Sequence, residues 1–356
     1  MKLQHVERLP DTPNPGRSVR RLAASATLCV LVSVCYWWQP DWLAPVTLVP
    51  AWFWLVPAFT LLAFEFSRTH KRWCVAVAAF WVVYAALMVE EVQSLVRSGS
   101  RPTSEWQAAR ASGRAIRVVS LNCAAANRAV TAELAKWEPD IVLLQESPGR
   151  EHVDCTSREL FGTDGGFLWS SDTSIIARGD VRPRNVDRDS HFVHAQVELP
   201  TGLKADVMSV RLDPPVFRLD FWMPGFWIDH RNRRLKHRRQ IREIMQRVEN
   251  IEQAGPLIVG GDFNAPPGDP ALVPLERRLY DSFRKAGRGW GNTGTSAVPL
   301  FRVDQIWVSP HLRAESVTAQ KTLHSDHRMV VCDLALTWTT KPVSITKRTQ
   351  AWRRKP

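Results

Sequence analysis

Hydrophobic positions follow two different patterns along the chain, one before about residue 93 and another after about residue 115. The first part holds three long apolar runs, Leu22–Trp38, Trp42–Phe66 and Trp73–Val89. Each run is close to the roughly 20 residues that a helix needs to cross a bilayer, and Trp residues stand at several of their ends, as at membrane interfaces. The second run contains three prolines, which membrane helices tolerate better than soluble ones. We therefore expect three transmembrane helices within residues 1–93, not buried helices of a soluble domain.

The basic residues of the short connections predict the orientation of these helices, because such residues favour the cytoplasmic side. Five Lys and Arg residues precede the first run and three lie between the second and third, whereas the connection after the first run has none. Glu90 and Glu91 follow the third run, and Arg97 and Arg101 reduce the asymmetry. The distribution predicts a cytoplasmic N-terminus in a plasma or inner membrane, with everything after Val92 outside the cytoplasm. A cleaved signal peptide is not expected, because the first run does not end in small residues.

The pattern changes near Ala115 to short β-branched runs bounded by turns, which predict strands. The predicted strands are 116–121, 141–145, 205–210, 256–260, 303–308 and 329–336. Between them we expect a helix over 131–137, hairpins within 174–197 and a long basic helix over about 232–253. This alternation predicts an α/β sandwich at 115–340, after a polar linker at 94–114 and before a basic tail at 341–356.

Polar side chains cluster where the predicted strands end. They are Asn122, Glu146, Asp262, Asn264, Asp304, Asp326 and His327. Carboxylates held at the end of a buried strand suit a hard cation. Each motif alone also fits a turn or a cap. Five such motifs at the ends of successive strands do not all fit that explanation, and together they indicate an active site.

In order along the chain, these motifs are Leu-Asn, Leu-Leu-Gln-Glu, Gly-Asp-Phe-Asn, Arg-Val-Asp-Gln-Ile and Ser-Asp-His. The set resembles that of the endonuclease/exonuclease/phosphatase superfamily, which includes deoxyribonuclease I, inositol polyphosphate 5-phosphatases and neutral sphingomyelinases. The resemblance covers about residues 116–337 and leaves the membrane region outside. It implies a four-layer α/β sandwich with the active site at one edge of two packed sheets. It also implies Mg²⁺-dependent hydrolysis of a phosphate ester, with Mn²⁺ as an alternative ion.

The resemblance further implies a role for each residue of the metal site. Glu146 is the main ligand of Mg²⁺ on this reading, and Asn122 completes the ligand shell through oxygen or water. Asp326 lies near the metal. One or two carboxylates with retained waters are the ligand set that Mg²⁺ prefers.

The resemblance assigns the remaining motif residues to catalysis. Asp262 orients or deprotonates the attacking water, and Asn264 holds a phosphate oxygen. His327 contacts the phosphoryl group and is oriented by Asp304. A dication and neutral donors offset the charge that makes a phosphate ester resist attack, and a carboxylate aligns the nucleophile.

Arg211 departs from the family pattern, which usually has His or Tyr after the strand at 205–210. A guanidinium still binds phosphate, so Arg211 remains a candidate substrate-binding residue. Two functions therefore stay open. One is a membrane-anchored phosphodiesterase, nuclease or phosphatase, and the other is a catalytically weak or inactive tethered module that binds phosphate-containing ligands. The sequence does not separate a nucleic acid from a phospholipid headgroup as substrate, and no protein partner is evident.

An aromatic stretch followed by basic residues stands out at 216–242. This composition suits insertion at a lipid interface or stacking on single-stranded nucleic acid. It also suits aromatic rings packed on the sandwich beside the wet face of a helix.

Composition adds a net charge of +12 and six cysteines in 356 residues, which excludes a disulfide-rich scaffold. The cysteines form no CxxC pair, so a structural zinc site is not expected. Cys123, Cys155 and Cys332 are the candidates for one disulfide if the domain is extracytoplasmic.

Overall fold

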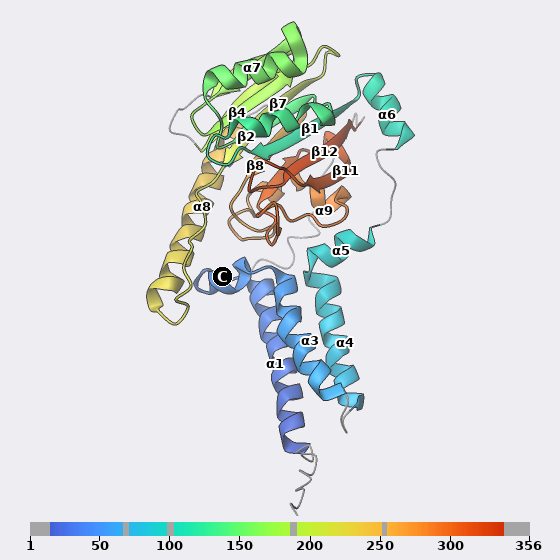
Figure 1. Ribbon diagram of the computed structural model, residues 1–356, viewed down its shortest axis with the longest axis vertical. Helices are drawn as coiled ribbons and strands as arrows, with labels where there is room; N and C mark the ends of the chain where they lie inside the picture. Colours follow the sequence, from blue (N-terminus) through green and yellow to red (C-terminus); the bar gives the residue numbers. More distant parts are fainter. Residues whose placement is uncertain (1–14, 67–70, 98–102, 186–190, 251–254, 338–356) are drawn as a thin grey trace, which may run out of the picture.

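The computed structural model describes residues 15–66, 71–97, 103–185, 191–250 and 255–337. An α/β domain lies at one end of the molecule, and a bundle of three helices extends away from it (Figure 1). The predicted basic tail lies outside the described residues.

Two six-stranded sheets form the α/β domain. The first has the order β11 (Leu312–Gln320), β12 (Met329–Leu336), β1 (Ala115–Asn122), β2 (Ile141–Gln145), β4 (Thr173–Arg178) and β3 (Gly165–Trp169). The second has the order β5 (Asp180–Asn185), β6 (Phe192–Glu198), β7 (Lys204–Arg211), β8 (Leu257–Asp262), β10 (Asp304–Val308) and β9 (Tyr280–Asp281). In each sheet one central pair of strands is parallel, β1 with β2 and β7 with β8. The carboxyl ends of the two pairs lie at the same edge of the domain, because Asn122 at the end of β1 contacts Asp262 at the end of β8.

The sheets pack face to face over an apolar core to which β2, β7, β8 and β12 all contribute. Gly260 permits this close approach, because a Cβ at that position would lie 2.6 Å from Cδ1 of Leu143 on the facing sheet. Strand β2 is buried on both faces, which explains its uninterrupted apolar sequence. Leu143 faces the second sheet, and Leu144 faces the outer layer.

Helices cover the outer faces of both sheets. Helix α8 (Pro224–Asn250) packs on the second sheet through Ile241, Ile244, Met245 and Val248. The first sheet is covered by α7 (Arg150–Phe161), η3 (Arg128–Glu133) and η4 (Ala135–Trp137). The predicted α/β fold of two sheets with helices is therefore confirmed.

Several predicted elements differ in detail from the structure. Residues 131–137 form short 3₁₀ turns and not an α-helix. Helix α8 begins at Pro224, eight residues before the expected start at about 232, so part of the aromatic stretch is helical. Helix α6 (Ser104–Ala111) lies within the expected linker, and its buried Trp106 donates from Nε1 to the Leu334 carbonyl at 3.2 Å. Helix α9 (Ser282–Ala286) follows β9.

The N-terminal part of the chain contains two helices long and apolar enough to span a bilayer, α1 (Pro15–Trp38), from Ser18 onward, and α4 (Lys71–Met88). Between them lie η1 (Asp41–Leu43), α2 (Ala44–Leu48), η2 (Ala51–Trp54) and α3 (Leu55–Phe66). The second apolar run is bent by 76° between Asp41–Leu48 and Ala51–Ala63. The expected count of three spans is therefore not confirmed: the described residues give two, or three if the bent pair forms one span.

Prolines account for the break in the second run. Pro45 stands in the first turn of α2, and Pro50 immediately precedes η2. Proline lacks the N–H that a continuing helix needs but is well suited to the first turn of a new one. Each proline therefore marks a restart of the helix.

Ion pairs fasten the bundle to the α/β domain. Arg302 lies 2.9 Å from Glu90, which begins α5 (Glu90–Val96), and also pairs with Asp281. Arg238 of α8 lies 2.7 Å from Asp41 in the connection after α1. None of the six cysteines, all of which lie within the described residues, forms a disulfide, so the one considered for Cys123, Cys155 and Cys332 is not formed in this structure.

Candidate functional site

The carboxyl ends of the parallel strands bring the predicted polar residues to one edge of the sheets. Asn122 ends β1 and Glu146 directly follows β2. In the second sheet, the register places Arg211 at the end of β7 beside Asp262 at the end of β8. Asp304 begins the antiparallel strand β10 directly opposite Asp262. The β-ladder alone therefore gathers residues that lie far apart in the sequence.

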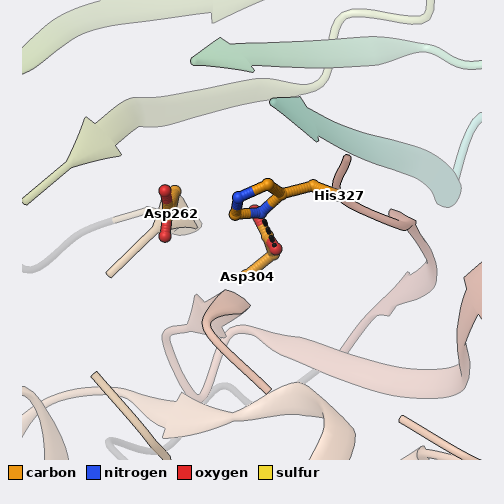
Figure 2. Close-up of side chains that lie close together, drawn as sticks. All are labelled: Asp262, Asp304 and His327. Atoms are coloured by element: carbon orange, nitrogen blue, oxygen red, sulfur yellow. Dashed lines mark hydrogen bonds and ion pairs between the residues drawn. The ribbon is translucent and has the colours of Figure 1, made fainter. Parts of the chain in front are cut away.

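Asp262, Asp304 and His327 form a compact cluster. Nδ1 of His327 lies 2.8 Å from Oδ2 of Asp304, and Figure 2 shows the imidazole between the two carboxylates. One potential ligand atom from each residue lies within 4.8 Å of the others. Both carboxylates are buried, and Oδ1 of Asp304 has no hydrogen-bond partner among the described residues. The cluster has the geometry of a metal site or of an acid–base group.

Burial and mutual charge shift the proton affinities of this cluster. Burial, together with the charge of Asp304, raises the pKa of the Asp262 carboxyl group well above its usual range. Burial opposes the charged form of His327, but the charge and hydrogen bond of Asp304 outweigh it and raise the pKa of the imidazole to about 10. At neutral pH His327 is therefore a cation held beside an acid that takes up a proton easily.

Asn122 links this cluster to Glu146. Its Nδ2 lies 3.2 Å from Oδ2 of Asp262 and 3.3 Å from Oε1 of Glu146. Its Oδ1 accepts the backbone N–H of Ala124 at 2.9 Å. Glu146 has a left-handed backbone, with φ of 47°, and its second carboxylate oxygen accepts the N–H of Ala125. The turn after β1 thus holds the side chains of both residues.

Arg211 occupies the space between Glu146 and a carboxylate that the sequence analysis missed. Its Nη2 lies 2.9 Å from Oε1 of Glu146, and its Nη1 lies 3.0 Å from Oδ1 of Asp172. Although burial opposes ionisation, the Ala125 N–H and the Arg211 charge hold the pKa of Glu146 below its usual range. Asp172 lies in the turn between β3 and β4, a stretch whose sequence indicates only a polar turn. The expected phosphate-binding arginine therefore contacts the expected metal ligand.

Asn264 and Asp326 differ in how closely they contact the cluster, and the roles expected of them stay predictions. The backbone N–H of Asn264 donates to Asp262 at 2.9 Å, and its Nδ2 donates to the Leu212 carbonyl at 2.8 Å and to Asp262 at 3.1 Å. These bonds make Asn264 a support for the Asp262 carboxylate. Asp326 is exposed and is not part of the Asp262–Asp304–His327 cluster.

Ser325, next to Asp326, has a positioning role that the sequence analysis did not assign. Its hydroxyl donates to the Asn122 carbonyl at 2.7 Å and accepts the backbone N–H of His327 at 3.0 Å. One side chain therefore ties the loop of His327 to the end of β1. The Ser-Asp-His motif contained the residue, but the partner strand was not visible in the sequence.

The donor chemistry of this edge fits a hard divalent cation. Glu146 offers a partly exposed carboxylate beside the Asn122 amide, and Asp262 and Asp304 offer buried carboxylate oxygens. Such oxygen ligands are those that Mg²⁺ and Mn²⁺ take in proteins. The Arg211 guanidinium on the same Glu146 oxygen is a competing positive charge.

A model of the Endonuclease/Exonuclease/phosphatase family matches residues 119–327. The endonuclease/exonuclease/phosphatase from Bacteroides vulgatus is 16% identical, with 63% of this chain and 99% of that chain covered and a TM-score of 0.48. D. rerio TDP2 complexed with single strand DNA product is 19% identical, with 62% and 98% covered and a TM-score of 0.46. A Bacteroides thetaiotaomicron mannosyl-6-phosphatase is 15% identical, with 62% and 100% covered and a TM-score of 0.46. None of the curated proteins matches the chain significantly.

Proposed function

Because the chain belongs to the endonuclease/exonuclease/phosphatase family, we propose that it is a membrane-anchored, divalent-metal-dependent hydrolase of phosphate esters. The catalytic domain is residues 115–340, and residues 1–93 anchor it with the site outside the cytoplasm. The observation that carries the proposal is the buried Asp262–Asp304–His327 cluster, which Asn122 joins to Glu146 at one sheet edge. The substrate is a phosphodiester, as in a nucleic acid or a phospholipid headgroup, or a phosphomonoester.

Glu146 and Asn122 would hold the metal ion, Mg²⁺ or Mn²⁺, which supplies charge stabilisation to the phosphoryl oxygens when bound. Glu146 contributes the negative charge, and its low pKa keeps it ionised over the whole physiological range. Asp326, exposed next to His327, is a further carboxylate at this edge.

Asp262 would act on the attacking water. Its raised pKa makes it a better proton acceptor than an ordinary carboxylate, because base strength rises with pKa. Hydrogen bonds from Asn122 and Asn264 fix the carboxylate, so it aligns the water without reorganising.

His327 would stabilise charge on the phosphoryl group. The imidazole is held by Asp304 through Nδ1, which leaves Nε2 free to donate towards a substrate oxygen. Asp304 acts through the ring: it fixes the orientation and keeps the proton on it.

The contact between Arg211 and Glu146 favours the second function, a tethered module that binds phosphate without turnover. A guanidinium on the main ligand oxygen competes with a cation and can itself bind a phosphate. The complete set of Glu146, Asp262, Asp304 and His327 favours the enzyme, because a binder does not need a water-activating carboxylate.

The full chain in nanodiscs, incubated with Mg²⁺ or Mn²⁺, tests the proposal. The substrates are single-stranded DNA, a phosphatidylcholine and phosphatidylglycerol mixture, and p-nitrophenyl phosphate. We expect hydrolysis of one class that chelator abolishes and that Asp262→Asn reduces severely. Phosphate binding without hydrolysis of any substrate would instead support the binding module.

A further inference from the structure

An exposed apolar turn precedes α8, and we call its residues, Phe217–Met223, the tip. The exposed fractions are 88% for Phe217, 89% for Leu219, 63% for Phe221, 70% for Trp222 and 48% for Met223. The side chains of the tip are therefore not packed on the sandwich, in contrast to one of the three arrangements that the sequence allows for 216–242. A contiguous group of large exposed apolar side chains marks a binding surface.

Hydrogen bonds give the tip a defined conformation. The indole N–H of Trp227 donates to the Phe221 carbonyl at 2.8 Å, and the N–H of Met223 donates to the Asp220 carbonyl at 2.8 Å. Arg218 pairs with Asp220 of the tip and with Asp229 of α8, so both charged side chains of the tip are paired. Moving an apolar turn from water into lipid costs less free energy when its charged groups are already paired than when they are unpaired.

The middle of α8 is fixed to the membrane region. The buried Arg234 lies 2.9 Å from Asp269 and donates to the Thr47 hydroxyl at 2.6 Å, and Arg238 pairs with Asp41. From Arg234 to Pro224, ten residues of helix extend for about 15 Å. Figure 1 shows this end of α8 directed along the bundle, past the level at which α1 ends.

The tip therefore lies beside the part of the bundle nearest the α/β domain (Figure 1). Large apolar side chains are exposed near those ends of the helices, such as Val34 and Trp38 of α1 and Leu87 of α4. Trp38 ends α1, three residues before the Asp41 that pairs with Arg238 of α8. Trp is enriched at the edge of a bilayer.

We propose that the tip inserts into the lipid leaflet beside the bundle and forms a second contact with the bilayer that α1 and α4 span. This inference rests on the membrane anchoring in the proposed function. Two exposed arginines, Arg231 and Arg239, follow the tip along α8 and would meet anionic headgroups at the surface of the leaflet. Because the segment after Arg211 leads directly to the tip, this contact holds the site edge over the lipid surface.

A cysteine-reactive, polarity-sensitive dye on the full chain in nanodiscs of phosphatidylcholine and phosphatidylglycerol tests the insertion. The test protein carries Leu219→Cys together with Cys155→Ser. The matched control is the native exposed Cys155 on α7, which lies at the end of the molecule away from the bundle (Figure 1). The Cys155→Ser protein alone corrects for labelling of other cysteines.

We expect the dye at residue 219 to shift to shorter wavelength and to lose most of its emission to lipids spin-labelled near the headgroup. The dye at Cys155 keeps its emission. A wash of membranes with alkaline carbonate, which removes proteins that do not span the bilayer, tests the anchoring separately. If the protein stays in the membrane, equal and unquenched emission at both positions would overturn the insertion. Extraction by carbonate would instead refute the anchoring itself and, with it, the insertion. A response of residue 219 to single-stranded DNA but not to spin-labelled lipid would also overturn the proposal.

Discussion

Among single residues, we expect Arg211 and Glu146 to determine how strongly the candidate site binds a cation. Glu146→Gln should weaken Mn²⁺ binding at least about tenfold, because an amide is a poorer ligand for a hard ion. Arg211→Gln should strengthen binding by about tenfold, because it removes a positive charge from the same oxygen. Isothermal titration of both variants measures this, with exposed Glu159→Gln as the control. Unchanged affinity in both variants would place the ion elsewhere.

His327 and Asp304 should behave as one unit in catalysis. Asp304→Asn misplaces the imidazole or changes its tautomer, and His327→Ala removes it, so each should lower kcat by roughly 10²- to 10⁴-fold. The double variant should be little worse than His327→Ala alone. Melting temperatures measured in parallel distinguish this from a loss of stability. Independent, multiplying losses would show that the two residues act separately.

The raised pKa values predict the pH dependence of kcat/KM. Asp262 accepts a proton only when ionised, so activity should rise with pH through its raised pKa. His327 donates only while charged, so activity should fall as the pH passes about 10. Asp304 raises both pKa values, and Asp304→Asn should therefore move both limbs to lower pH. A profile of that variant with unmoved limbs would contradict these assignments.

The sequence indicated which residues belong to the candidate site, but it did not indicate which of them contact one another. Polar residues at strand ends can be recognised because buried apolar runs lead into them, as for Glu146 after β2. Asp172 was missed because it reaches the site from a turn, through Arg211. Asp326 is exposed beside His327, and its expected place near the metal stays a prediction. Which side of a loop points inward depends on contacts such as that of Ser325 with Asn122, which no local pattern encodes.

At the scale of elements, hydrophobic periodicity predicted the central strands well and the short helices poorly. Strands 141–145 and 329–336 have the predicted bounds, because both are buried β-branched runs between turns. The stretch 131–137 was read as a helix, but it is too short to propagate one and forms 3₁₀ turns. In the second apolar run, composition predicted one span, whereas its prolines divide it.

The buried pairing of Arg302 connects α5 with β9 and should carry much of the stability of the interface. Arg302→Met removes the nearest counterion of Glu90 and of the buried Asp281, which keep only the longer contacts with Arg284 at 3.6 and 3.8 Å. The loss should cost about 3 kcal/mol and lower Tm by roughly 10 °C. The control is Arg158→Met, which removes an exposed pair with Asp154 and should cost at most about 1 kcal/mol. Thermal unfolding in detergent measures both. Equal melting temperatures would assign the interface to its apolar contacts.

At the scale of the whole molecule, direct contacts join the site edge to α8 and α8 to the helical bundle. The loop after Asp262 reaches Arg234 through Asp269, and Arg234 reaches the N-terminal part of the chain through Thr47. The site edge, α8 and the bundle are thus joined by direct contacts. A rigid connection of this kind fixes which way the site faces, whatever its substrate.

The basic residues at the ends of the helices predict on which side of the membrane the site lies. The starts of α1 and α4, with Arg20, Arg21, Lys71 and Arg72, lie at the end of the bundle away from the α/β domain (Figure 1). Because basic residues favour the cytoplasm, the domain should be extracytoplasmic. An alkaline phosphatase fusion, active only outside the cytoplasm, should be active after residue 340 and inactive after residue 69. A β-galactosidase fusion that works after residue 340 would reverse the orientation and place the site, with the tip, on the cytoplasmic leaflet.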